Sequence, residues 1–202
     1  MRDRILETAL RLCKTYGVKS ITMQDIAKEC GISKKTVYEH FSDKNELIDE
    51  VTNFMTGTYC NQLADCQDAG RDAIEELVLS IGHTERMARS TNPVLLFELE
   101  KYHPSAWKKV KNFKDEMVAA IIRSNLERGI REGLYRNNLR ADIMVYLRLM
   151  QMDALFNPVQ FPAAQFEMHD VMYQITVHYI NGIATPEGQA LLEQYLPSSI
   201  TA

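Results

Sequence analysis

The feature that most constrains the fold of this chain is a succession of segments whose apolar residues recur every three to four positions, the period of an α-helix. In the first segment, residues 2–16, the residues expected to share one buried face are Ile5, Ala9, Leu12, Cys13 and Tyr16. No segment alternates polar and apolar residues in the way that predicts a β-strand. We therefore expect an all-α fold of about nine to ten helices.

Helix caps and helix breakers divide these segments from one another. Glycines stand where helices should end, and Thr22 and Ser33 stand where the next ones should begin, with a hydroxyl able to accept a backbone N–H. Pro93 and Pro104 occupy first-turn positions, which tolerate proline. The expected helices cover residues 2–16, 23–30, 34–40, 44–67, 71–90, 93–102, 104–132, 141–156, 163–181 and 186–196.

The composition limits the class of protein. The 202 residues are 46% hydrophobic, which is enough for a sizeable core. No apolar run approaches the roughly 20 residues that cross a bilayer. The N-terminal sequence MRDRILETAL lacks the apolar block of a secretory signal. We expect a cytoplasmic protein with no membrane partner.

The residues that usually carry metal or catalytic chemistry form no recognisable pattern. Cys13, Cys30, Cys60 and Cys66 form no CxxC pair and have no histidine at a zinc-ligand spacing, so they are expected to fill the core. The sequence also lacks a glycine-rich phosphate loop and the GxSxG and HExxH motifs. We expect no metal, no cofactor and no enzymatic activity.

Charge is distributed unevenly along the chain. The formal net charge is −4, which weakly disfavours a nucleic-acid-binding protein. Residues 1–45, however, contain nine Lys/Arg and six Asp/Glu, so this part carries +3 and the remainder −7. The positive charge that a polyanionic partner would require is therefore concentrated at the N-terminal end.

Residues 23–40 contain two short expected helices joined by a tight turn, a pattern that a plain helical hairpin also shows. The spacing is more specific: Ala27 is small where the helices would cross, Gly31 gives the turn its backbone freedom, and Val37 faces the core. This spacing indicates the helix-turn-helix of DNA-binding proteins. The outward groups of the second helix suit phosphates and base edges, and they are Lys34, Lys35, Thr36, Tyr38, Glu39 and His40.

The stretch ITMQDIAKECGISKKTVYEHFSDKNELI, residues 21–48, resembles the DNA-binding domain of the TetR (tetracycline repressor) family of transcriptional regulators. The match covers roughly residues 2–50 and is strongest from Gly31 to Tyr38. The resemblance implies a helix-turn-helix DNA-binding domain over residues 1–45 and a helical ligand-binding and dimerisation domain over residues 46–202. It further implies a sequence-specific regulator of transcription, most often a dimeric repressor that a small molecule releases from its operator.

The resemblance also implies which residues contact DNA. Thr22 would hold a phosphate at the start of the second helix, and Lys44 would hold another at the start of the fourth. The start of the recognition helix would meet backbone and bases through Ser33, Lys34, Lys35 and Thr36. Tyr38 and His40 would contact the backbone, and Tyr38 could instead contact a thymine methyl. Glu39 departs from the family, which often has a second aromatic residue there. We favour an ion pair with Lys35, but a bond from cytosine is the alternative, so the base preference stays open.

The expected helix at residues 141–156 is apolar nearly all round, and such a helix is buried on most sides. Its two apolar stripes are Ile143, Leu147, Met150 and Ala154, and Val145, Leu149, Met152 and Phe156. A second chain is the simplest cover for one stripe, and the resemblance implies that this helix and the next form a four-helix bundle about a two-fold axis. The expected homodimer interface comprises Ile143, Leu147, Met150, Ala154, Val171, Met172, Ile175 and Tyr179. A larger core within one chain is the alternative.

The resemblance implies a small-molecule pocket whose occupation would change the spacing of the recognition helices. The candidate lining residues are Tyr59, His83, Phe97, Trp107, Met117, Ile121, Asn125, Met150 and Gln151, for each of which core packing is the alternative. The expected partners are a palindromic operator in double-stranded DNA, a second copy of the chain and a small-molecule effector. The alternative function is a regulator of the same fold that answers to a protein partner or acts as an activator.

Overall fold

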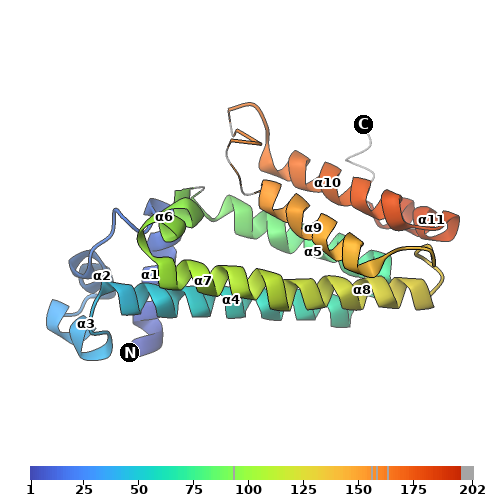
Figure 1. Cartoon of the computed structure of the whole chain (residues 1–202). Coiled ribbons are helices and arrows are strands. Elements are labelled where there is room, and N and C mark those ends of the chain that lie inside the picture. The colour runs from blue at the N-terminus through green and yellow to red at the C-terminus, as the bar shows by residue number, and fades with distance from the viewer. Residues whose placement is uncertain (93, 156, 158, 163, 197–202) are drawn as a thin grey trace. The chain divides into compact units, whose positions relative to one another are not determined.

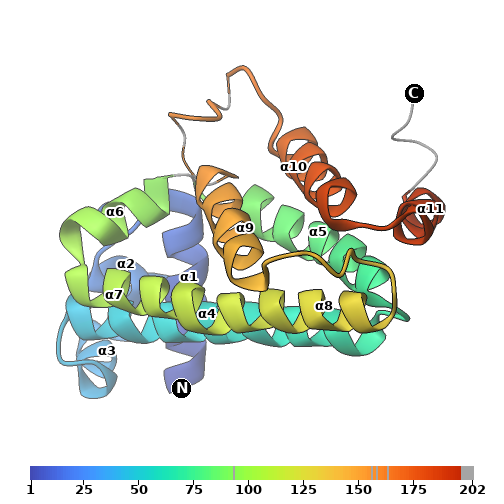
Figure 2. The ribbon, with the colours of Figure 1, turned by 45° about the vertical axis from the view of Figure 1, so that its right-hand side comes forward.

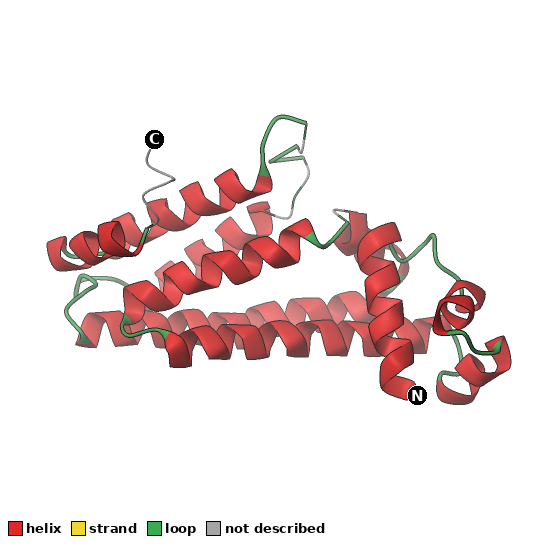
Figure 3. Ribbon diagram, turned by 180° about the vertical axis from the view of Figure 1, so that it is seen from behind, coloured by secondary structure: helices red, strands yellow, loops and turns green. Residues whose placement is uncertain are grey.

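The computed structural model describes residues 1–92, 94–155, 157, 159–162 and 164–196. Within these residues the regular structure is helical and contains no strand, which confirms the all-α prediction (Figure 3). The helices are α1 Arg2–Tyr16, α2 Met23–Cys30, α3 Lys34–His40, α4 Lys44–Ala69, α5 Ala73–Arg89, α6 Val94–Tyr102, α7 Pro104–Asn112, α8 Ala119–Arg131, α9 Ala141–Leu155, α10 Met168–Ile183 and α11 Pro186–Tyr195. A π-helical segment, Phe113–Val118, joins α7 to α8, so the described residues form ten continuous helices.

The observed helix bounds lie within a few residues of the expected ones, with two exceptions. α10 begins at Met168 rather than at residue 163, because the carbonyl of Pro162 accepts the N–H groups of Gln165 and Phe166 and closes a separate turn. The helix expected over residues 104–132 contains the π-helical segment, for which the sequence has no signal. Pro93, Phe156 and Ala163, expected inside helices, lie outside the described residues.

By packing, the chain divides into two compact units. Unit 1 comprises residues 1–60 and 88–115, and unit 2 comprises residues 61–87 and 116–202. The packing therefore groups α6 and α7 with the three N-terminal helices. The expected boundary at residue 45 separates the chain by role rather than by packing, and it stays a prediction.

The core of unit 1 joins the N-terminal helices to α4 and α6. Its most deeply buried side chains include Ile5, Ile26, Val37, Phe41, Leu47, Leu95 and Leu99. Each such side chain contributes about 1.5–3 kcal/mol by leaving water. In both views α6 lies beside the end of α1, and α7 runs along the first half of α4 (Figures 1 and 2). The helix-turn-helix thus shares one core with α6.

Two smaller expectations about buried residues have different outcomes. Tyr16, expected on the buried face of α1, is 58% exposed, because the chain turns at Gly17 and Val18 is buried instead. The cysteine prediction is largely confirmed, since three of the four thiols are buried and Cys60 is half-buried.

No described helix combines the length and the hydropathy that crossing a membrane requires.

Unit 2 contains a polar network at the junction of α4 and α5. The Arg128 guanidinium on α8 pairs with Glu76 at 3.1 Å and with Glu132 at 2.7 Å, and it donates to the carbonyl of Gly70 at 2.9 Å. Burial raises the pKa of the Glu76 carboxyl, while hydrogen bonds from Asn125 and Arg128 oppose that rise. The Arg128 side chain therefore binds a carbonyl at the end of α4 and two carboxylates, and these contacts fix α8 against the α4–α5 junction.

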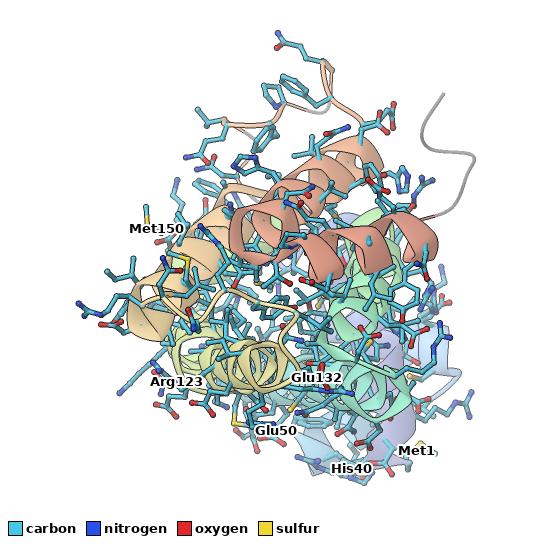
Figure 4. The ribbon with its side chains drawn as sticks, turned by 90° about the vertical axis from the view of Figure 1, so that its right-hand side faces the viewer. Met1, His40, Glu50, Arg123, Glu132 and Met150 are labelled. Atoms are coloured by element: carbon cyan, nitrogen blue, oxygen red, sulfur yellow. The ribbon has the colours of Figure 1, made fainter. Side chains whose placement is uncertain are left out.

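The variant Arg128→Ala should lower the free energy of unfolding by about 3 kcal/mol, because it leaves the buried Glu76 without its cation. Urea titration measures this change. Arg123→Ala is the control, since Arg123 is exposed on the same helix and should shift the stability by less than about 0.5 kcal/mol (Figure 4). Equal stabilities for the two variants would show that the network does not support the fold.

Candidate nucleic-acid interface

A glycine turn sets the angle between α2 and α3. Gly31 has φ 65° and ψ 34°, a left-handed conformation that glycine adopts without the strain a Cβ brings. The N–H groups of Gly31 and Ile32 donate to the carbonyls of Lys28 and Ala27 at 3.1 and 3.0 Å, which closes the end of α2. The chain can then begin α3 only three residues later in a new direction. This turn confirms the expected helix-turn-helix geometry.

Both short helices are capped by the side chains expected from the sequence. The Thr22 hydroxyl accepts the Asp25 N–H at 3.2 Å, and the Asp25 carboxylate accepts the Thr22 N–H at 2.9 Å. Hydrogen bonds from Thr22 lower the pKa of the Asp25 carboxyl. The Ser33 hydroxyl accepts the Thr36 N–H at 3.1 Å. Such caps stabilise a helix end by about 1 kcal/mol, which matters for helices this short.

α3 has one buried face and one exposed face. Val37 on α3 and Phe41 just after it are buried in the core of unit 1. Lys34, Lys35 and Tyr38 are exposed, and the Lys34 ammonium lies 5.7 Å from the centroid of the Tyr38 ring. The remaining expected contacts differ in exposure: Thr22 and Ser33 are exposed, whereas Thr36, His40 and Lys44 are half-buried. The exposed face therefore offers cations, hydroxyls and one aromatic ring.

Lys44 has a structural role that the sequence did not reveal. Its ammonium donates to the carbonyls of Val18 and Ile21 at 2.7 and 2.6 Å, so the first turn of α4 is tied to the turn between α1 and α2. Desolvation by burial lowers the pKa of this ammonium. Because an ammonium has three N–H donors, one donor remains for the expected phosphate contact.

The expected ion pair between Lys35 and Glu39 is wrong. Both residues lie in the described part of the chain and both are exposed, yet no ion pair joins them there. An exposed i, i+4 pair gains only about 0.5 kcal/mol, so the side chains extend into solvent at little cost. A bond from cytosine to Glu39 stays open as the alternative.

Asn92, just before α6, and Glu98, within α6, hold the segment between α1 and α2. The sequence did not predict either contact. Asn92 donates its N–H to the carbonyl of Lys14 at 2.6 Å. The Glu98 carboxylate accepts the N–H of Lys19 at 2.9 Å. No local pattern could have shown these contacts, because about 80 residues separate Glu98 from Lys19.

The expected ligand-pocket residues come from both units. Tyr59, Phe97 and Trp107 belong to unit 1, where Tyr59 is buried and Phe97 is 56% exposed. Trp107 is half-buried against the core of unit 1. The members that belong to unit 2 are His83, Met117, Ile121, Asn125, Met150 and Gln151. Their role in ligand binding stays a prediction.

Within unit 2 the expected pocket residues differ in exposure and partners. Met117 and Met150 are exposed, and Figure 4 labels Met150 on α9. Asn125 is buried and donates to the carbonyl of Ala73 at 3.0 Å, while its own carbonyl accepts from the Tyr135 hydroxyl at 3.0 Å. His83 and Gln151 are half-buried beside arginines, and Ile121 is half-buried.

A small apolar cavity lies in unit 1. Its volume is about 10 Å³, which admits at most one water molecule. Its lining comes from α1, the turn after α1, α4 and α6, and comprises Leu10, Cys13, Val18, Ile48, Val51, Thr52, Met55, Leu95 and Leu99. None of these is an expected ligand-pocket residue. Burial raises the pKa of the Cys13 thiol to about 12, so this group stays protonated and apolar in character.

The two expected dimer helices present different surfaces. On α9 the second stripe is buried at Val145 and Leu149, whereas Ile143, Tyr146, Leu147 and Met150 are between 43% and 72% exposed. Ala154 is half-buried. On α10, the expected interface residues Val171, Met172 and Tyr179 are buried within this chain, and Ile175 is half-buried. An exposed apolar face therefore exists on α9 but not at these positions of α10.

Residues 5–51 match the family described as bacterial regulatory proteins, tetR family. The HTH-type transcriptional regulator YvaF of Bacillus subtilis (strain 168) is 27% identical over 195 residues, which cover 93% of this chain and 97% of that protein. The HTH-type transcriptional repressor KstR2 of Rhodococcus jostii (strain RHA1) is 24% identical over 193 residues, 92% of each protein.

The fold itself is shared with solved structures. A transcriptional regulator from Saccharomonospora viridis, in complex with choline, superposes with a TM-score of 0.77 at 21% identity and covers 91% of this chain and 97% of that chain. The family match coincides with the capped helix-turn-helix and its exposed cationic face. The N-terminal part of the chain therefore carries a DNA-binding domain of the tetR family, and the chain is a DNA-binding transcriptional regulator.

Proposed function

We propose that this regulator is a repressor that binds a palindromic operator as a homodimer, acts in the cytoplasm without enzymatic activity, and is released from DNA by a small molecule. One observation carries the DNA-binding part: Lys34, Lys35 and Tyr38 are exposed on a helix whose start and buried face are both fixed. KstR2, a repressor that matches along nearly the whole chain, supports repression.

The proposed DNA contacts divide into positioning and reading groups. Phosphate contacts from lysines and hydroxyls supply most of the affinity and fix the register, whereas contacts to base edges supply the specificity. Lys34, Lys35 and the remaining donor of Lys44 suit phosphates, and Tyr38 suits the backbone or a thymine methyl. The full proposed set is Thr22, Ser33, Lys34, Lys35, Thr36, Tyr38, His40 and Lys44.

The homodimer is supported by the exposed apolar face of α9. Ile143, Tyr146, Leu147 and Met150 recur at helical spacing and are exposed together, which is unusual for a surface that stays in water. A second copy would cover this face across a two-fold axis. Two recognition helices would then read half-sites about one helical turn apart, roughly 34–36 Å.

Control by a small molecule is supported by the S. viridis regulator, whose structure contains choline. A ligand releases DNA only if it binds the DNA-free conformation more tightly, and a hundredfold preference lowers operator affinity by about a hundredfold. The water-sized cavity in unit 1 admits no metabolite, so it is not the proposed effector site. The second candidate function is a regulator of the same fold that is controlled by a protein partner.

Replacing Lys35 with Gln should weaken operator binding and lower the slope of log K against log salt by about 1 for each subunit bound, because one phosphate contact is lost. Fluorescence anisotropy over a range of salt concentrations measures both quantities. Lys111→Gln is the matched control, since Lys111 is an exposed lysine of α7 in the same unit. A slope that Lys35→Gln leaves unchanged would refute the phosphate contact.

Replacing Leu147 with Glu should give a folded monomer, because the side chain is exposed in one chain but would place a charge inside the proposed interface. Sedimentation velocity measures the mass of the particle. Arg123→Glu adds the same charge to an exposed site on α8 and should remain a dimer. A dimeric Leu147→Glu variant would place the interface elsewhere.

Titration of the protein–operator complex with a panel of metabolites that includes choline tests the proposed effector. We expect at least one compound to lower operator affinity by about tenfold or more and to raise the melting temperature of the free protein. If no compound does so, while a cellular protein displaces the operator, control by a protein partner replaces this part of the proposal.

A further inference from the structure

We propose that a second surface of unit 1 binds the phosphate backbone of DNA beside the site read by α3. This surface, the Lys–Tyr patch, consists of Lys19, Phe97, Lys101 and Tyr102. It adds α6 to the DNA-binding elements, and it rests on the proposed function because the same operator would occupy both surfaces.

The patch brings two ammonium groups to one aromatic ring. The Lys19 ammonium lies 5.2 Å from the centroid of the Tyr102 ring, and the Lys101 ammonium lies 5.4 Å from the same centroid. Lys101 also lies 5.6 Å from the centroid of Phe97. All four side chains are exposed, with Tyr102 at 42%. The negative ring faces attract both cations, but the two cations still repel each other.

In the described part of the chain, neither Lys19 nor Lys101 forms an ion pair with a carboxylate. The Glu98 carboxylate instead accepts the backbone N–H of Lys19 at 2.9 Å, and Glu100 is an exposed neighbour of Lys101. An anion from another molecule would relieve the repulsion between the two ammonium groups.

Lys19 is fixed close to an expected phosphate contact. It lies three residues before Thr22, so the two Cα atoms are at most about 11 Å apart. The turn that carries Lys19 is held on both sides, by the Lys44 ammonium on the carbonyls of Val18 and Ile21 and by the Glu98 carboxylate. Gly17 has φ 79°, and a Cβ there would lie 2.6 Å from the Glu98 carboxylate. The turn is therefore shaped to seat Glu98.

Continuity with the helix-turn-helix identifies DNA as the partner. A strand of DNA presents a phosphate about every 3.4 Å along the helix axis, so a backbone that meets Thr22 continues past Lys19. Unit 1 holds 15 Lys/Arg and 12 Asp/Glu, whereas unit 2 holds 8 and 15. The excess of positive charge gives unit 1 an electrostatic field that favours a long polyanion over a small acidic ligand.

Salt-dependent binding to two duplexes tests the patch. The short duplex is the operator selected by the protein, and the long duplex adds roughly 10 base pairs, one helical turn, at each end. Lys19→Gln and Lys101→Gln should each lower the salt slope on the long duplex by about 1 per subunit bound. When the salt concentration rises from 50 to 200 mM, a protein with one phosphate contact fewer loses about 3.5-fold less of its DNA affinity. On the short duplex we expect smaller changes.

Controls separate this proposal from the function on which it rests. Lys111→Gln, in the same unit, should leave both slopes unchanged, and Tyr102→Leu should lower the long-duplex slope if the ring positions the ammonium groups. Thermal melting verifies that each variant is folded. If Lys35→Gln lowers the slope and both patch variants leave the long-duplex slope unchanged, the patch is refuted and the α3 interface stands. If the unmodified protein binds neither duplex at low salt, the proposed function itself fails.

Discussion

The ammonium of Lys44 is the interaction on which the DNA-binding unit depends. Lys44 is the first residue of α4, and its ammonium donates to two carbonyls of the turn between α1 and α2, at 2.7 and 2.6 Å. Partial burial of this cation costs free energy unless it is hydrogen-bonded, and unpaired carbonyls are costly as well, so the ammonium and the carbonyls satisfy each other. Through this one side chain the long helix, the turn and the start of α2 hold a common geometry.

The exposed face of α3 follows from that geometry through local constraints. The capped start of α2, the left-handed Gly31 and the Ser33 cap leave α3 little freedom of direction. Val37 in the core then determines which face of the helix is buried. A seven-residue helix would not be stable alone, so tertiary packing rather than helix propensity holds the lysines in place.

The sequence predicted best what short-range rules determine. Caps, the glycine turn and the helical period gave nearly all helix bounds, because each depends on residues within one or two turns. The contact from Glu98 to Lys19 was not predictable, since nothing local links residues 79 positions apart. The two stripes of α9 were recognised, but only packing shows that Val145 is buried while Leu147 is exposed. Which side chains of α10 are buried likewise depends on tertiary packing, which the sequence pattern does not show.

The central claim is that two copies of α3 read duplex DNA as a symmetric pair. Selection from a random duplex pool by the purified protein, followed by sequencing, tests this claim most directly. The account predicts an enriched palindrome whose half-site centres are about 10–10.5 base pairs apart, or a multiple of that spacing. A pool that shows no enrichment, or one enriched for a single site without two-fold symmetry, would contradict it.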